Sequence, residues 1–167
     1  VDADNGAFKW GEGNRSIQGE IHAPAAVGDN RVYVVSTNGR IYAYEATSGT
    51  YQWDTLLGGL LDQAPVIVKD GVVVVGRGAG AFALNAANGL KKWTTPGIAR
   101  IISDNGGMLY CLNDQGGLSV LDAASGRITR SAPLTGAVDF AGAANDSTLY
   151  VATDDGWVLR VQDAGGH

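Results

Sequence analysis

Residues 43–53 read AYEATSGTYQW and residues 83–93 read ALNAANGLKKW, with alanine, glycine and tryptophan at matching places. Shorter copies in the same frame are GAFKW at residues 6–10 and GRITR at residues 126–130. The turn glycines of these four copies are spaced by 43, 40 and 37 residues, and Gly166 lies 40 residues beyond the last. A period near forty residues is typical of architectures in which one supersecondary unit recurs.

Each period contains four short runs with high strand propensity. In the first complete period the runs are Ala23–Val27, Arg31–Ser36, Arg40–Glu45 and Thr50–Thr55. The next period repeats three of them as Ala64–Val68, Val72–Val75 and Ala81–Asn85. Turn-forming residues such as Gly28-Asp29-Asn30 and Asp70-Gly71 separate the runs, which is a strong signal for β-hairpins. We therefore expect each period to form a four-stranded antiparallel meander.

The strands do not alternate strictly between apolar and polar residues. Runs such as RVYVVS and VVVV predict sheets that are covered on both faces. No stretch has apolar residues at helical spacing. The sequence thus predicts an all-β protein, a β-propeller of four-stranded antiparallel blades, with residues 1–167 forming a single region of four repeats. A Greek-key sandwich can hold as many strands but does not require the period.

The block that begins at Ala43 resembles the tryptophan-docking motif AxDxxTGxxxW of the quinoprotein-type (PQQ-like) propeller repeat family. Glu45 stands in the acidic place and Ser48 in the hydroxyl place. The second copy has asparagine at both of these places, and in the third copy Arg130 replaces the tryptophan. The resemblance covers most of the chain and implies the same propeller fold.

The motif has a physical rationale. A tryptophan on the outer strand fills the wedge between blades, an alanine opposite leaves room for it, and a glycine permits the tight turn. These structural docking residues are Gly6, Trp10, Ala43, Gly49, Trp53, Ala83, Gly89 and Trp93. We expect Trp53 and Trp93 to be largely buried, and the junction at Arg130 to be the weakest.

The resemblance implies two classes of function. Enzymes of the family hold pyrroloquinoline quinone and calcium, with an aspartate base and often a disulfide between adjacent cysteines. Cys111 is the single cysteine here, and we find no carboxylate pair outside turns and motif positions. We therefore assign no catalytic, cofactor-binding or metal residues and expect no cofactor. A fragment of a quinoprotein dehydrogenase or of another propeller enzyme stays the alternative.

Other relatives keep the blades and bind no cofactor, such as the outer-membrane assembly lipoprotein of Gram-negative bacteria and sensor regions of bacterial kinases. The resemblance to them implies a non-enzymatic, extracytoplasmic bacterial module that binds protein or envelope components through its loop faces. A net charge of -5 without a Lys/Arg cluster argues against nucleic acid as a partner. The longest aliphatic run, Val72–Val75, is far too short to span a membrane, and we see no signal peptide.

Three features are candidates for contacts. The run Leu56–Leu61, LLGGLL, is either a packed plug between blades or an exposed apolar edge, with Leu57 and Leu60 as candidate partner contacts. Trp157 follows a turn glycine and belongs to no docking motif, so it is either a partner contact or a core filler. His22, expected on an innermost strand, could bind a ligand together with Glu20, although a lone histidine is more often structural or solvated.

The phase of the repeats predicts how a ring would close. Residues 7–10 would form a fourth strand, and the strand expected near residues 158–162 lacks one. Pairing these two segments removes exposed strand edges. We expect an eight-bladed ring, formed by two chains that exchange strands or by a longer parent chain, rather than a four-bladed monomer.

Overall fold

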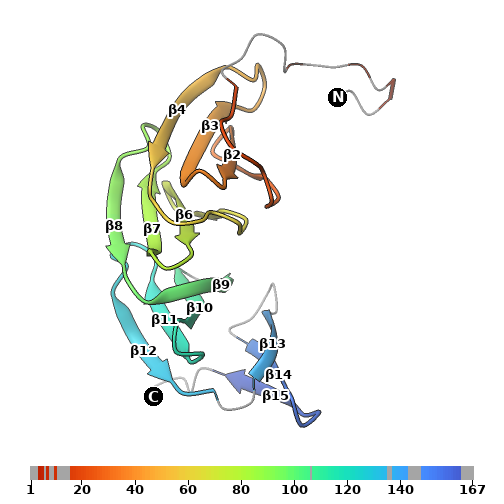
Figure 1. The fold of residues 1–167 in the computed structure, drawn as a ribbon, viewed down its shortest axis with the longest axis vertical. Coiled ribbons are helices and arrows are strands. Elements are labelled where there is room, and N and C mark those ends of the chain that lie inside the picture. Colours follow the sequence, from red (N-terminus) through yellow and green to blue (C-terminus); the bar gives the residue numbers. More distant parts are fainter. Residues whose placement is uncertain are drawn as a thin grey trace.

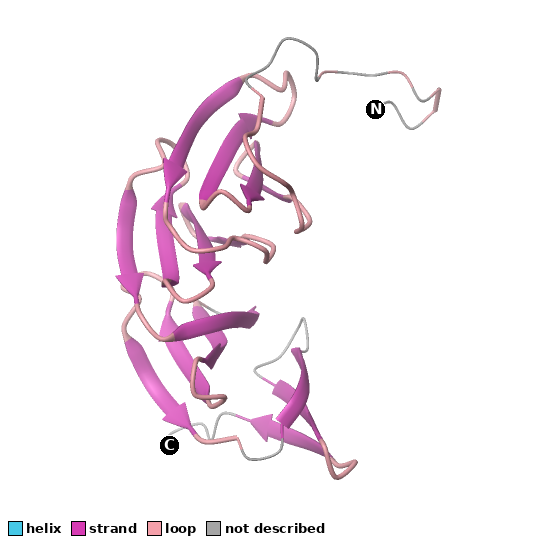
Figure 2. Cartoon of the chain, viewed as in Figure 1, coloured by secondary structure: helices cyan, strands magenta, loops and turns pink. Residues whose placement is uncertain are grey.

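The computed structural model describes residues 4–5, 7, 10, 16–105, 107–134, 137–142 and 148–162. These residues form strands and turns and contain no helix (Figure 2). No helix long and apolar enough to cross a membrane therefore occurs in this part of the chain. Gly6 and Gly166, the first and last turn glycines of the repeat, lie outside the described residues.

The strands form four antiparallel sheets in chain order. The first sheet contains β1 (Ala26–Gly28), β2 (Arg31–Ser36), β3 (Arg40–Glu45) and β4 (Tyr51–Leu56). The second contains β5 (Val66–Val68), β6 (Gly71–Gly76), β7 (Gly80–Asn85) and β8 (Lys91–Thr95). The third contains β9 (Ile98–Asn105), β10 (Met108–Asn113), β11 (Leu118–Asp122) and β12 (Ile128–Ala132). The fourth contains β13 (Ala137–Gly142), β14 (Thr148–Thr153) and β15 (Val158–Gln162).

The predicted meanders are confirmed, because each sheet follows the chain from one strand to its neighbour. The sheets stack along a crescent, with β4, β8 and β12 on its convex side and the first and fourth sheets at opposite ends (Figure 1). The β1–β2 turn has positive φ at Asp29 (50°) and Asn30 (56°), as tight hairpins require.

The inner strands are shorter than the sequence predicts. Strand β1 begins at Ala26 instead of Ala23, and β5 begins at Val66 instead of Ala64. Pro24 and Pro65 precede these strands and have no N–H for a strand ladder. His22 therefore lies ahead of β1, and its predicted place on the innermost strand is wrong.

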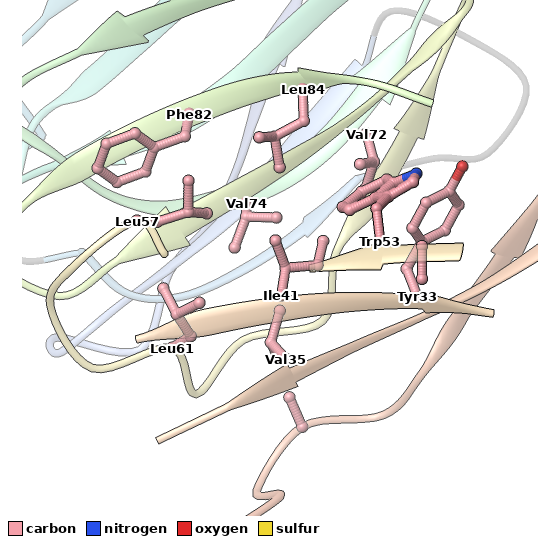
Figure 3. Packing of buried hydrophobic residues seen from close by; sticks show 12 residues of the cluster. Tyr33, Val35, Ile41, Trp53, Leu57, Leu61, Val72, Val74, Phe82 and Leu84 are labelled. Carbon is pink, nitrogen blue, oxygen red and sulfur yellow. The ribbon is translucent and has the colours of Figure 1, made fainter. Parts of the chain in front are cut away.

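Apolar side chains fill the spaces between successive sheets. One cluster joins Tyr33, Ile41 and Trp53 of the first sheet to Val72, Val74 and Leu84 of the second (Figure 3). A second cluster joins the other face of the second sheet, including Val73 and Ala83, to Leu109 and Leu121 of the third. All six residues of β6 are buried, which confirms that both faces of this sheet are covered.

Candidate functional site

The tryptophan of each motif copy binds the next sheet along the chain. The indole Nε1–H of Trp53 donates a hydrogen bond to the Ala86 carbonyl, with an N···O distance of 3.0 Å. Trp93 makes the same bond to Ala123 at 3.0 Å, and Trp10 makes it to Ala46 at 3.0 Å. Three successive copies thus repeat one inter-sheet contact, and the alanine that accepts the bond directly follows the acidic place of the motif.

The motif glycine has two roles, of which the sequence indicated only one. Gly89 has φ of +71°, as its turn requires. It also lies directly beneath the ring of the preceding tryptophan, because a Cβ added to Gly89 would come within 2.5 Å of Trp53 Cε3. Gly49 and Gly126 lie beneath Trp10 and Trp93 in the same way. The glycine is therefore also the contact surface for the indole.

A β-bulge directs each docking side chain. The pairing of β3 with β4 shifts register between Ala43 and Tyr44, and equivalent shifts occur in the second and third sheets. Immediately beside the shift, Ala43 pairs with Trp53 and Ala83 pairs with Trp93, as the role of the motif alanine requires. An extra residue in one strand bends it and changes the direction of its side chains. The residue spacing of the motif accommodates this bulge, but the sequence pattern alone does not predict it.

Burial differs between the docking residues. Trp53 is only 8% exposed, whereas Trp93 is half-buried and Trp10 is 37% exposed. The expectation of deep burial is thus confirmed for Trp53, while Trp93 is less covered than expected. Arg130, which replaces the tryptophan in the third copy, is exposed, and the third and fourth sheets share the smallest apolar cluster among the described residues.

The acidic place of the motif caps a turn. Glu45 accepts hydrogen bonds from the Ser48 backbone N–H and from Asn30 Nδ2, the latter at 2.7 Å. Asp122 accepts from the backbone N–H and the hydroxyl of Ser125 at 2.8 and 2.6 Å. The bonds from Ser48 lower the pKa of Glu45 to about 2, and those from Ser125 lower the pKa of Asp122. Both carboxylates are therefore ionised turn caps, which fits a structural role for them.

Comparison with known proteins agrees with this geometry. Residues 1–102 match the family model described as outer membrane protein assembly factor BamB. The chain belongs to this family. It is 31% identical over 116 residues to the BamB of Moranella endobia (strain PCIT), covering 64% of this chain and 30% of the relative. It is 29% identical over 168 residues to the BamB of Burkholderia pseudomallei (strain K96243), covering 89% of this chain and 43% of the relative.

Solved structures show the same fold. The crystal structure of BamB from Moraxella catarrhalis superposes with a TM-score of 0.79 at 19% identity, over 97% of this chain and 52% of that one. The computationally designed Ika4 protein superposes with a TM-score of 0.71 at 15% identity, over 94% of this chain and 98% of that one. The chain spans less than half the length of the two curated BamB relatives.

The leucine-rich connection of this BamB-family chain is packed rather than exposed at two of its four leucines. Leu57 and Leu61 are 8% and 0% exposed and belong to the cluster between the first two sheets. Leu60 is half-buried, and its carbonyl accepts a hydrogen bond of 3.0 Å from the Arg77 N–H. The structure therefore corrects the assignment of Leu57 as a candidate partner contact, because its side chain helps to join the blades.

The other candidate contacts lie at the surface. Trp157 is 67% exposed beside the β14–β15 turn, which favours a contact residue over a core filler. His22 Nε2 lies 2.9 Å from Glu20 Oε2, so the two predicted ligand residues do meet, but both side chains are largely exposed. The described residues contain no group of three histidine, cysteine or acidic side chains that could hold a metal ion.

Cys111, Glu45 and Asp122 do not form a site for a quinone with calcium. Cys111 is buried, and burial raises the pKa of its thiol to about 12, so it stays a protonated core side chain. The motif carboxylates Glu45 and Asp122 cap turns through serine partners. None of these residues supplies a ligand set for the cofactor of the enzymatic relatives.

Proposed function

We propose that the chain is a non-enzymatic, extracytoplasmic β-propeller module that binds protein partners during outer membrane protein assembly. Membership of the BamB family over residues 1–102 carries this proposal, because the relatives are named as outer membrane protein assembly factors. The chemistry of the motif supports it. Among the described residues, the motif tryptophans and glycines join blades and the motif carboxylates cap turns, which leaves the loops and edges for partners.

We further propose that Trp157 contacts such a partner. Its ring is 67% exposed, and the neighbouring Val158 is 69% exposed. Large aromatic side chains contribute most to binding when a partner covers them. Leu60, half-buried at the connection between blades, is the second proposed contact.

A photo-crosslinking amino acid at position 157 tests the function. In a bacterial envelope, it should crosslink to a component of the outer membrane protein assembly machinery. The same amino acid at Asn88, exposed on the β7–β8 turn of the second sheet, is the matched control. Equal crosslinking at both positions, or products limited to abundant unrelated proteins, would argue against the proposal.

We also propose that two copies of the chain complete an eight-bladed ring. Trp10 docks on the first sheet through Ala46 and Gly49, while β15 pairs with β14 on one side and with no described strand on the other. The first sheet and β15 lie at opposite ends of the crescent (Figure 1). A segment around Trp10 from a second copy could pair with β15, and twofold symmetry is the commonest symmetry of oligomers.

Light scattering tests the ring. The expected mass is twice the 17.2 kDa of one chain. Arg160→Pro, which removes an N–H in β15, should yield monomers because proline cannot continue a strand ladder. Arg127→Ala, at an exposed position, serves as the control and should stay dimeric. A compact particle of 17.2 kDa for the unaltered chain at dilute concentration would contradict the proposal.

A further inference from the structure

One position facing the gap between blades differs in the second repeat. Tyr33, Tyr110 and Tyr150 occupy the third place of β2, β10 and β14, and Val73 occupies it in β6. The registers make the four positions equivalent, because Tyr33 pairs with Ala43, Val73 with Ala83, Tyr110 with Val120 and Tyr150 with Arg160. The second repeat therefore lacks a phenol ring that the other three carry.

The first repeat shows what this ring does. Tyr33 is fully buried, and its ring centroid lies 5.9 Å from that of Trp53. The two rings lie side by side at the junction with the second sheet, near Val72 (Figure 3). Because Ala43 pairs with both residues, the tyrosine and the tryptophan flank its small side chain. In the second repeat Val73 is too short to do this, and Trp93 is correspondingly less buried than Trp53.

A cavity of about 780 Å³ lies at the junction between the second and third sheets, and Ala83, the residue that pairs with Val73, lines it. Ala83 is the counterpart of Ala43, and Met108 and Leu109 line the cavity on the third sheet. Charged side chains also line the cavity, with Lys69 and Lys92 from the second sheet and Asp104 and Asp122 from the third.

We propose that this cavity binds the phenol ring of a tyrosine presented by a protein partner. The proposal rests on the protein-binding function proposed above and names the chemistry of one contact. Part of the lining is apolar, as an aromatic ring requires, and the junction between the first and second sheets accommodates the same ring. The lining also carries lysine ammonium groups and aspartate carboxylates, which can donate to and accept from a phenol hydroxyl. An aliphatic side chain would make no use of these groups.

The indole of Trp93 provides a direct reporter. Its Nε1–H donates to the Ala123 carbonyl at 3.0 Å, and Ala123 lines the cavity. We expect p-cresol, the side-chain analogue of tyrosine, to shift the Trp93 indole NMR signal, which the loss of a peak in Trp93→Phe identifies. A ligand of this size should bind with a dissociation constant on the order of 1 mM. The Trp53 indole, which binds Ala86 at the filled junction, is the internal control.

A pair of blocked tripeptides identifies the source of the ring. N-acetyl-Gly-Tyr-Gly-amide should shift the same signal, and N-acetyl-Gly-Leu-Gly-amide should bind at least tenfold more weakly. Binding of p-cresol without binding of the tyrosine peptide would mean that the site takes a free phenol, which would overturn the proposal. Equal binding of both peptides would overturn it as well, because the site would then not select the ring.

Two substitutions test the location of the site in opposite directions. Val73→Tyr supplies the missing ring and should abolish the response to p-cresol. Tyr33→Val should open an equivalent space at the first junction, so that the Trp53 indole also responds. If Val73→Tyr does not fold, Ala83→Leu fills the cavity from the neighbouring strand and should have the same effect. Unchanged p-cresol binding in a folded cavity-filling variant would overturn the proposal.

These outcomes are independent of the test at position 157. A chain that binds the tyrosine peptide but gives no specific crosslink would keep the aromatic site and lose the proposed assembly function. A chain that crosslinks specifically but does not bind the peptide would keep the function and lose the site.

Discussion

Replacement of Trp53 by alanine should lower the free energy of unfolding by about 3–5 kcal/mol, as expected for the loss of a buried tryptophan. Trp53 is 8% exposed, packs against Tyr33, and donates a hydrogen bond to Ala86 of the next sheet. The substitution removes these contacts and leaves a cavity between the first two blades. Urea unfolding at one fixed protein concentration measures the loss, because any association would make stability concentration-dependent.

Trp157→Ala is the matched control. Its ring is 67% exposed, and surface substitutions usually change stability by no more than about 0.5 kcal/mol. Trp93→Ala should fall between the two, because Trp93 makes the same hydrogen bond but is only half-buried. Equal losses for all three variants would contradict the assignment of Trp53 and Trp93 as docking residues.

Gly89→Ala should destabilise the chain by about 3 kcal/mol, the sum of a backbone and a contact effect. The φ of +71° disfavours any residue with a Cβ, and the added carbon would lie within 2.5 Å of the Trp53 ring. Gly78→Ala separates the two effects, because Gly78 has φ of +75° but nothing within 4 Å of an added Cβ. Only the backbone cost, about 1 kcal/mol, should appear there.

A double variant tests whether the contact is with the indole. Once Trp53 is alanine, a Cβ at position 89 no longer meets a ring. The double variant should therefore lose less stability than the sum of the losses of the two single variants. Residues in direct contact show such non-additivity, whereas distant residues do not. Full additivity of Trp53→Ala and Gly89→Ala, or equal effects of Gly89→Ala and Gly78→Ala, would contradict the proposed role of the glycine.

The sequence repeat alone predicted most of the strands of the blades. The period, the hairpin signals and the apolar runs predicted four-stranded antiparallel blades, and the bounds of β2 and β3 matched the expected runs. These features are local, because turn chemistry and strand propensity depend on a few neighbouring residues. The inner strands were less well predicted, because Pro24 and Pro65 shorten the ladders in a way that the apolar pattern does not show.

The candidate contacts were less predictable. The run Leu56–Leu61 has the same composition whether it faces solvent or a core, and only its contacts show that Leu57 and Leu61 join the blades while Leu56 is 55% exposed. Likewise, Trp157 and Trp53 are the same residue type, and their opposite burial depends on which sheet lies against each ring.

The sequence by itself therefore determined the all-β class, the repeat and the residues of the docking motif, since each of these depends on local spacing. Only the tertiary structure decided that Gly89 lies beneath Trp53, that a bulge beside Ala43 precedes the docking ring, and that a cavity lies beside Ala83 between the second and third sheets. The physical reason is that these features arise between sheets. An inter-sheet contact joins residues about thirty positions apart, and its geometry depends on how two folded blades pack against each other.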